Sequence, residues 1–128
     1  MTVQVTAIML GVEDLARSKE FYETGLGCKI DQDHPNFVSF DLGAGSSSLA
    51  LYKREAAARD AGVSSEGSGF RGVSLHYIVS TSDEVDEVIA KALSAGGSVV
   101  KQADGAAWGY FGYFADPDGY LWKVASSS

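Results

Sequence analysis

The 128-residue sequence has one cysteine, two prolines and fewer basic than acidic residues. With Cys28 alone, an intrachain disulfide is excluded, so a hydrophobic core must hold the fold together, which fits a reducing compartment. Ten Lys and Arg against 17 Asp and Glu give a formal net charge of −7. Because proteins that neutralise phosphates need the opposite balance, nucleic acid is excluded as an expected partner.

Long hydrophobic runs are also missing. No stretch approaches the roughly 20 apolar residues of a membrane helix, and residues 1–5 lack the features of a secretory signal. We therefore expect a cytoplasmic protein with no membrane partner. Hydrophobic residues make up 45% of the chain, enough to form the core of one domain.

The first half of the chain reads as strand, helix and three strands. Residues 3–10 are apolar and β-branched, with Met9 on one face of the expected strand. Asp14 is a candidate N-cap for a helix that carries Phe21 and Tyr22 and ends at the glycines of residues 25–27. Short strands are expected at 28–31, 37–41 and 48–52.

The second half repeats this order. A strand is expected at 73–80, and Thr81 with Glu84 three residues later matches a capping box. The helix ends at residues 96–97 and has one apolar stripe, formed by Val85, Val88, Ile89, Ala92 and Leu93. Strands follow at 98–102, 109–115 and 120–125.

These elements predict an α+β fold of two βαβββ modules that arose by internal duplication. The modules span residues 1–52 and 73–128. Residues 53–72 begin with helix-favouring residues and continue into a glycine- and serine-rich stretch. That composition predicts a linker or mobile flap that lies outside the core.

Asp116-Pro117-Asp118-Gly119 has the residues of a type I turn between two strands. Aromatic residues at 108–114 precede it, and residues 120–124 (YLWKV) follow it. With residues 12–22 (VEDLARSKEFY) and 26–27, the sequence resembles the vicinal oxygen chelate superfamily, which includes glyoxalase I, extradiol dioxygenases and bleomycin-resistance proteins. The resemblance implies that the strands of both modules enclose an open, barrel-like cavity.

The resemblance also implies where metal ligands would lie. In metal-dependent members, His, Gln or Glu on the first and last strands of each module bind the metal. The matching positions here are Ala7, Ser74 and Lys123, with Leu51 as the fourth, or Ala50 if the register shifts by one. These side chains are not the ligands that divalent metals require. We therefore expect neither a metal nor another cofactor.

No other catalytic motif stands out. Cys28 has no histidine near it in sequence and is expected to be a small buried residue. His34 lies beside Pro35, where a solvated turn is expected. His76 follows Ser74 by two residues, so on a strand the two share a face. A displaced metal site and acid–base catalysis by carboxylates remain alternatives.

Without a metal, the expected cavity is apolar and aromatic. Trp122 is expected in the core, whereas Trp108 is the expected platform for a ligand, with Tyr110 or Phe111 beside it. Lys123 and His76 can hydrogen-bond carbonyl, phenolate or carboxylate groups. The predicted ligand-binding residues are Met9, Phe37, Leu51, His76, Trp108, Tyr110, Phe111 and Lys123.

Two functions follow from these residues. The first is a non-catalytic protein that sequesters an aromatic antibiotic or natural product for resistance, as in the bleomycin-resistance branch. The alternative is a glyoxalase- or dioxygenase-like lyase or isomerase with a relocated metal or none. In both cases the superfamily resemblance implies a homodimer with cavities at the interface.

Overall fold

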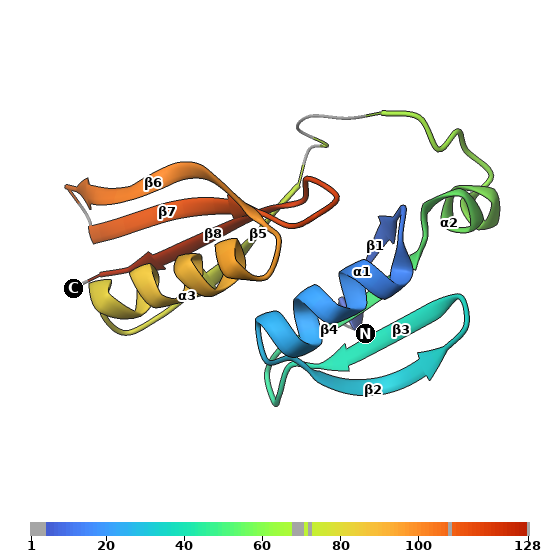
Figure 1. The fold of residues 1–128 in the computed structure, drawn as a ribbon, viewed down its shortest axis with the longest axis horizontal. Coiled ribbons are helices and arrows are strands. Elements are labelled where there is room, and N and C mark those ends of the chain that lie inside the picture. The colour runs from blue at the N-terminus through green and yellow to red at the C-terminus, as the bar shows by residue number, and fades with distance from the viewer. Residues whose placement is uncertain (1–4, 68–70, 72, 108, 128) are drawn as a thin grey trace, which may run out of the picture. The chain divides into compact units, whose positions relative to one another are not determined.

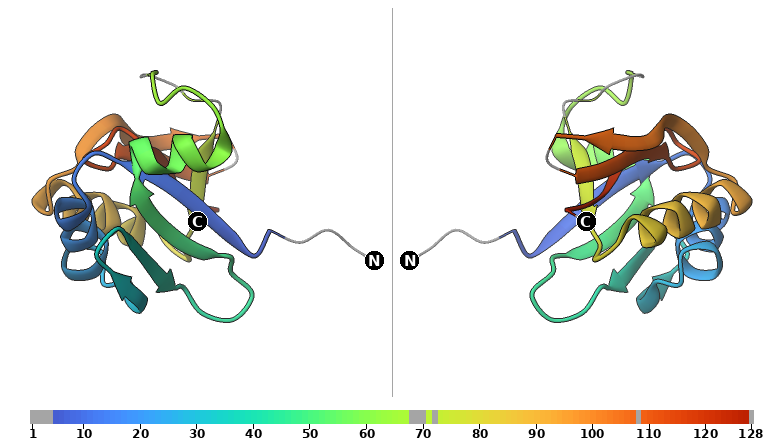
Figure 2. Two further views of the ribbon diagram at one scale, coloured as in Figure 1. Left: turned by 90° about the vertical axis from the view of Figure 1, so that its right-hand side faces the viewer. Right: turned by 90° about the vertical axis from the view of Figure 1, so that its left-hand side faces the viewer.

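The computed structural model describes residues 5–67, 71, 73–107 and 109–127. The chain forms two compact units, Met1–Glu66 (unit 1) and Gly67–Ser128 (unit 2). Each unit contains a four-stranded mixed sheet with a helix against one face (Figures 1 and 2). This arrangement confirms the predicted α+β fold.

Unit 1 contains a sheet in the strand order β1-β4-β3-β2, in which β1 runs parallel to β4 and the other pairs are antiparallel. Helix α1 contacts β3 and β4. Its elements are β1 (Ala7–Val12), α1 (Leu15–Glu20), the π-helical turn η1 (Phe21–Gly25), β2 (Lys29–His34), β3 (Phe37–Asp41), β4 (Ser48–Lys53) and α2 (Arg54–Ala61).

Unit 2 has the same topology, with the order β5-β8-β7-β6 and a parallel β5–β8 pair. Its elements are β5 (Ser74–Ile78), α3 (Ser82–Ser94), β6 (Ser98–Ala106), β7 (Gly109–Ala115) and β8 (Leu121–Ser126). Helix α3 contacts β6, β7 and β8. No helix among the described residues is both long and apolar enough to cross a membrane.

The core of unit 1 lies between α1, η1 and the sheet. Asp14 caps the helix by accepting a hydrogen bond from the backbone N–H of Arg17 at 3.1 Å. Phe21 and Tyr22 are fully buried and pack edge to face, and Tyr22 also contacts Phe40 of β3. The helical segment ends near Gly27, whose positive φ of 78° suits glycine, as predicted.

The core of unit 2 lies between α3 and its sheet. The Thr81 hydroxyl oxygen accepts a hydrogen bond from the backbone N–H of Glu84 at 3.2 Å, so Thr81 is the N-cap, as predicted. The Thr81 hydroxyl also donates to Oε1 of Glu84 at 3.2 Å. Val85, Ile89 and Ala92 are buried. Leu93, at the edge of the predicted apolar stripe, is 54% exposed.

The predicted linker contains helix α2, which contacts β1 and β4 and buries Ala57. The prediction that residues 53–72 lie outside the core is therefore wrong at this position. Alanine-rich sequence favours helix, and α2 follows β4 without a break. Arg54, the first residue of α2, also holds the loop that follows this helix, because its Nε donates to the backbone oxygen of Ser65 at 2.6 Å.

Several strand ends differ from those expected. β1 begins at Ala7, whereas the expected strand begins at residue 3. Residues 1–4 lie outside the described residues. β2 extends to His34, so this exposed histidine ends a strand and does not lie in the turn. β6 continues to Ala106 because it forms a long hairpin with β7, with register shifts between Val99 and Asp104.

The turn between β7 and β8 forms as predicted. The backbone N–H of Gly119 donates to the oxygen of Asp116 at 2.9 Å, and Gly119 has a φ of 87°. The buried Asp116 carboxylate accepts from the backbone N–H groups of Asp118 and Tyr120, each at 2.9 Å. The Arg71 guanidinium donates to the backbone oxygen of Asp118 and lies over the Tyr120 ring. These two contacts hold the turn that leads into β8.

Candidate functional site

The two faces of the unit 2 sheet differ in what they contact. A Cβ added to Gly112 would lie 2.8 Å from Cδ1 of Ile89 on α3, and the Tyr110 hydroxyl donates to Asp86 of the same helix at 2.8 Å. These β7 residues therefore point toward α3. Because side chains alternate along a strand, Phe111 and Tyr113 point to the other side, which we call the far face.

The Phe111 ring lies between two lysines on the far face. Nζ of Lys101 on β6 is 4.8 Å from the ring centroid, and Nζ of Lys123 on β8 is 4.7 Å from it. Tyr113 contacts the same ring edge to face, with 6.2 Å between centroids. β7 lies between β6 and β8, so the ammonium groups come from the two neighbouring strands. Each cation–aromatic contact stabilises by about 0.5–1 kcal/mol at an exposed site.

Strand register aligns these groups across the sheet. His76 pairs with Lys123, Lys123 with Tyr113, and Tyr113 with Lys101. Directly paired residues share a face, so the four side chains form one row that crosses all four strands. We call this the basic row of unit 2.

His76 is exposed and has one hydrogen-bonding neighbour on its own strand. Its Nε2 lies 3.0 Å from the Ser74 hydroxyl. The predicted shared face of these residues is therefore confirmed, and it gives the basic row a hydroxyl–imidazole pair at one end. A histidine held this way can donate or accept a hydrogen bond to a ligand.

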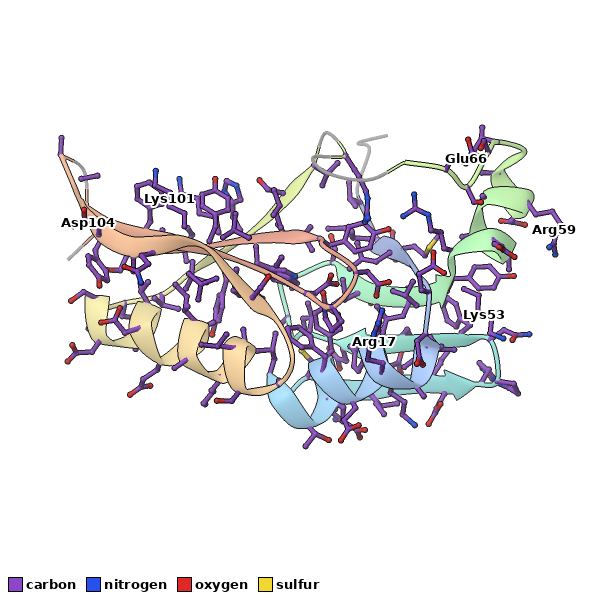
Figure 3. All side chains as sticks on the ribbon, turned by 45° about the horizontal axis from the view of Figure 1, so that its top comes forward. Arg17, Lys53, Arg59, Glu66, Lys101 and Asp104 are labelled. Carbon is purple, nitrogen blue, oxygen red and sulfur yellow. The ribbon has the colours of Figure 1, made fainter. Side chains whose placement is uncertain are left out.

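Four acidic residues of unit 2 lie away from the basic row. Asp83, Glu84, Asp86 and Glu87 all belong to α3, on the other side of the sheet. Figure 3 shows Lys101 projecting from β6 on the side away from α3, with Asp104 farther along the strand. Asp104 pairs with Phe111 and therefore shares the far face with it. Its Oδ1 accepts from the backbone N–H of Gly105 at 2.8 Å, which satisfies part of its hydrogen-bonding capacity locally.

The far face of unit 1 bears no basic row. Its matching row pairs Met9 with Ala50, Ala50 with Ser39, and Ser39 with Gln32. Met9 is 45% exposed, whereas Ala50 and Ser39 are buried. Phe37 lies on this face too, edge to face with Tyr52 at 6.1 Å between centroids.

Register also decides which residue of unit 1 matches Lys123. Leu51 pairs with Leu10 and Val38, is fully buried and belongs to the α1 side of the sheet. Its placement among the ligand-binding residues is therefore corrected. Ala50 lies on the far face. Ala50, which was the alternative if the register shifted by one residue, is therefore the residue of unit 1 that matches Lys123.

The remaining predicted residues divide between the faces. Of Tyr110 and Phe111, only Phe111 lies on the far face, so Tyr110 is corrected to the helix side, where its hydrogen bond to Asp86 raises its pKa. Trp122 stacks on Phe114 with 5.9 Å between centroids, which confirms its packing role. The predicted platform Trp108 lies outside the described residues.

Metal ligation does not fit the positions that the family resemblance implies. Ala7 and Ala50 have no donor atoms, the hydroxyl of Ser74 is a weak donor, and the ammonium of Lys123 repels a cation. Within the described part of the chain, no three His, Cys, Asp or Glu residues come together as a metal cluster.

Cys28 does not have the surroundings of a nucleophile. It follows η1 and is half-buried. Burial raises the pKa of its thiol to about 11. Because the thiolate is the reactive form, this cysteine stays protonated near neutral pH, as expected of a packing residue.

Sequence reasoning missed Tyr113 and Lys101 as residues of this site. Tyr113 alternates with Phe111 along β7, so strand periodicity alone could have placed both on one face. Lys101 could not be placed in this way, because β6 changes register on both sides of it.

Comparison with known proteins gives a consistent result. Residues 4–124 match the family model described as the Glyoxalase/Bleomycin resistance protein/Dioxygenase superfamily. A search of curated protein sequences gives no significant match.

Solved structures are also similar. A glyoxalase-related enzyme from Fulvimarina pelagi is 31% identical, with a TM-score of 0.87 over 96% of this chain and 87% of the other. A family enzyme from Burkholderia phytofirmans has 21% identity and a TM-score of 0.86 over 98% and 100% of the two chains. A lactoylglutathione lyase from Agrobacterium tumefaciens has 18% identity and a TM-score of 0.69 over 98% and 94%, which shows a shared fold alone. The chain belongs to the glyoxalase/bleomycin resistance protein/dioxygenase superfamily.

Proposed function

We propose that the protein binds an aromatic small molecule, an antibiotic or a natural product, and sequesters it without turnover. The observation that carries this proposal is the Phe111 ring flanked by Lys101 and Lys123 on the far face of unit 2. A planar ligand can stack on such rings, with about 0.5–1.5 kcal/mol per ring pair beyond burial. The ammonium groups supply hydrogen bonds for oxygen atoms at its edge.

The residues at the family's ligand positions support binding rather than metal-dependent catalysis. Lys123 stands where a metal-binding carboxylate would be expected, and it points to the same face as Phe111. Ala50, its counterpart in unit 1, has no polar side-chain atom. These residues favour holding a ligand over activating one through a bound cation.

The test is a titration of EDTA-treated protein with planar aromatic antibiotics, followed by tryptophan fluorescence. Phe111→Leu should weaken the affinity of any compound that binds by about tenfold, because a stacked ring is lost. Tyr110→Leu is the matched control, since its ring points toward α3. Trp108→Ala tests the remaining predicted platform. Equal affinities of wild type and Phe111→Leu would contradict the proposed site.

A second candidate is a lyase or isomerase with a relocated metal or none. The Ser74–His76 hydrogen bond at 3.0 Å favours it, because a hydroxyl–imidazole pair can move a proton. The similarity to a glyoxalase-related enzyme at 31% identity also favours it.

Elemental analysis and product analysis separate the two candidates. One equivalent of Zn, Ni, Mn or Fe in purified protein, or conversion of a bound ligand, would favour the enzyme. Loss of conversion in His76→Ala with ligand affinity unchanged would assign the proton transfer to this pair. A bound ligand recovered intact, with no stoichiometric metal, would favour sequestration.

We also propose that two copies of the chain associate. β1 and β5 are edge strands of their sheets and pair with their neighbours without a bulge, whereas the other edges, β2 and β6, show register shifts. A regular edge with exposed apolar residues, such as Ile78 on β5, is suited to further pairing. Light scattering that gives a monomer mass at micromolar concentration would contradict a dimer.

A further inference from the structure

We infer that the ligand of the far face of unit 2 is an anion, an aromatic carboxylate or phenolate, held by Lys101 and Lys123. This inference deepens the proposed function and rests on it, since it names the charge of the aromatic ligand. It requires a site for negative charge in a protein whose formal net charge is −7.

The position of the lysines carries the inference. Both ammonium groups lie within contact distance of one ring, at 4.8 and 4.7 Å from its centroid. Two ammonium groups gathered at one ring attract an anionic group, and the attraction grows where a bound ligand excludes water. An anionic group beside the ring gains this attraction, whereas a neutral ligand does not and a cationic ligand is repelled.

The basic row extends this site along the sheet. His76 pairs with Lys123 and is held by Ser74, so a hydrogen-bonding group lies beside the ammonium on the side away from Phe111. An aromatic acid that stacks on Phe111 and Tyr113 can therefore place its carboxylate near the lysines and a further oxygen near His76. Hydrogen bonds to charged groups are roughly twice as strong as neutral ones.

Charge separation within unit 2 supports the same reading. The acidic residues of α3 lie on the other side of the sheet, and Asp86 accepts the Tyr110 hydroxyl there. The far face thus carries Lys101 and Lys123 together with one carboxylate, Asp104, opposite Phe111. Short-range contacts dominate over the net charge because salt screens charges beyond about 10 Å.

The test compares three probes that differ in charge on one ring system: 2-naphthoate, 2-naphthamide and 2-naphthyl-trimethylammonium. Affinities are measured by isothermal titration calorimetry at fixed ionic strength. Wild-type protein should bind the naphthoate about tenfold more tightly than the amide. Lys123→Met and Lys101→Met should each reduce this preference, and the double variant should abolish it. Lys91→Met is the matched control, because this exposed lysine lies on α3 and not on the far face.

The outcomes separate the two proposals. Equal binding of naphthoate and amide, or tighter binding of the cationic probe, overturns the anionic ligand and leaves aromatic binding in place. Naphthoate preference that depends on both lysines but is unchanged by Phe111→Leu supports the anion site and contradicts the stacking platform. Naphthoate preference that survives in the double variant overturns the assignment to Lys101 and Lys123. Circular dichroism of each variant establishes that it is folded.

Discussion

The two units have matching helix sides and different far faces. Phe40 and Phe114 occupy corresponding places on β3 and β7 and are both buried, as are Leu51 and Val124 on β4 and β8. On the far faces, Ala50 corresponds to Lys123 and Ser39 to Tyr113. The difference shows that the two units share large apolar residues on the helix side, whereas the ammonium of Lys123 and the ring of Tyr113 have no counterpart at the matching positions of unit 1.

The variants with the largest expected effect on the free energy of unfolding test whether the two cores are similar. Phe40→Ala and Phe114→Ala should each lower the free energy of unfolding by about 3–5 kcal/mol, because each removes a buried ring and leaves a cavity. Urea unfolding measures both. Val63→Ala, at a position that is 65% exposed, is the control and should change stability by less than about 0.5 kcal/mol. A small loss at either phenylalanine would break the correspondence.

Cys28 provides a probe of unit 1 alone, because it is the protein's single cysteine. With its pKa raised to about 11 from 9.0, the native thiol should react with iodoacetamide at pH 8 about 100-fold more slowly than the unfolded chain. The raised pKa favours the protonated form, so its stabilising contribution is present below pH 9 and is lost between pH 9 and about 11. Equal labelling rates in native and unfolded protein would contradict the half-buried position.

Gly112 marks a difference between the helix sides, because Val38 occupies the corresponding place in unit 1. An added Cβ at Gly112 would lie 2.8 Å from Ile89 and 2.9 Å from the Ala103 backbone. Gly112→Ala should therefore destabilise the protein by about 1–3 kcal/mol, as overpacked cores do. Thermal unfolding checks this, and an unchanged midpoint would show that α3 and β6 can move apart at no cost.

The helix caps give the smallest effect. Asp14 caps α1 and Thr81 caps α3, each through the backbone N–H three residues later, at 3.1 and 3.2 Å. Asp14→Ala and Thr81→Ala should each cost about 1 kcal/mol. Asp14→Ser and Thr81→Ser keep an acceptor oxygen and should restore most of the stability in urea unfolding. Failure of both serine variants to do so would show that the caps do not act through this hydrogen bond.

Local signals in the sequence predicted much of the fold. The capping residues, the glycines that end the helices and the turn at residues 116–119 each depend on a few adjacent side chains, and all of them form as expected. Helix α2 was predicted less well, because its composition favours helix but burial of Ala57 depends on contact with β1 and β4.

The site was predictable only in part. His76 and Lys123 were identified because strand alternation and the family's pattern place them together, whereas the choice between Tyr110 and Phe111 stayed open until the structure placed Phe111 beside Lys123. The choice between Leu51 and Ala50 required the strand register, which depends on pairing between distant segments. Lys101 was missed because the bulges of β6 shift its side chain relative to simple alternation.

Chemical-shift mapping with 2-naphthoate tests whether the far face of unit 2 is the ligand site. We expect the largest backbone amide shifts around Lys101, Phe111, Tyr113 and Lys123, with much smaller ones along α3. These shifts should shrink in Lys123→Met. Shifts that are largest on α3, or that are unchanged in Lys123→Met, would contradict this placement of the site.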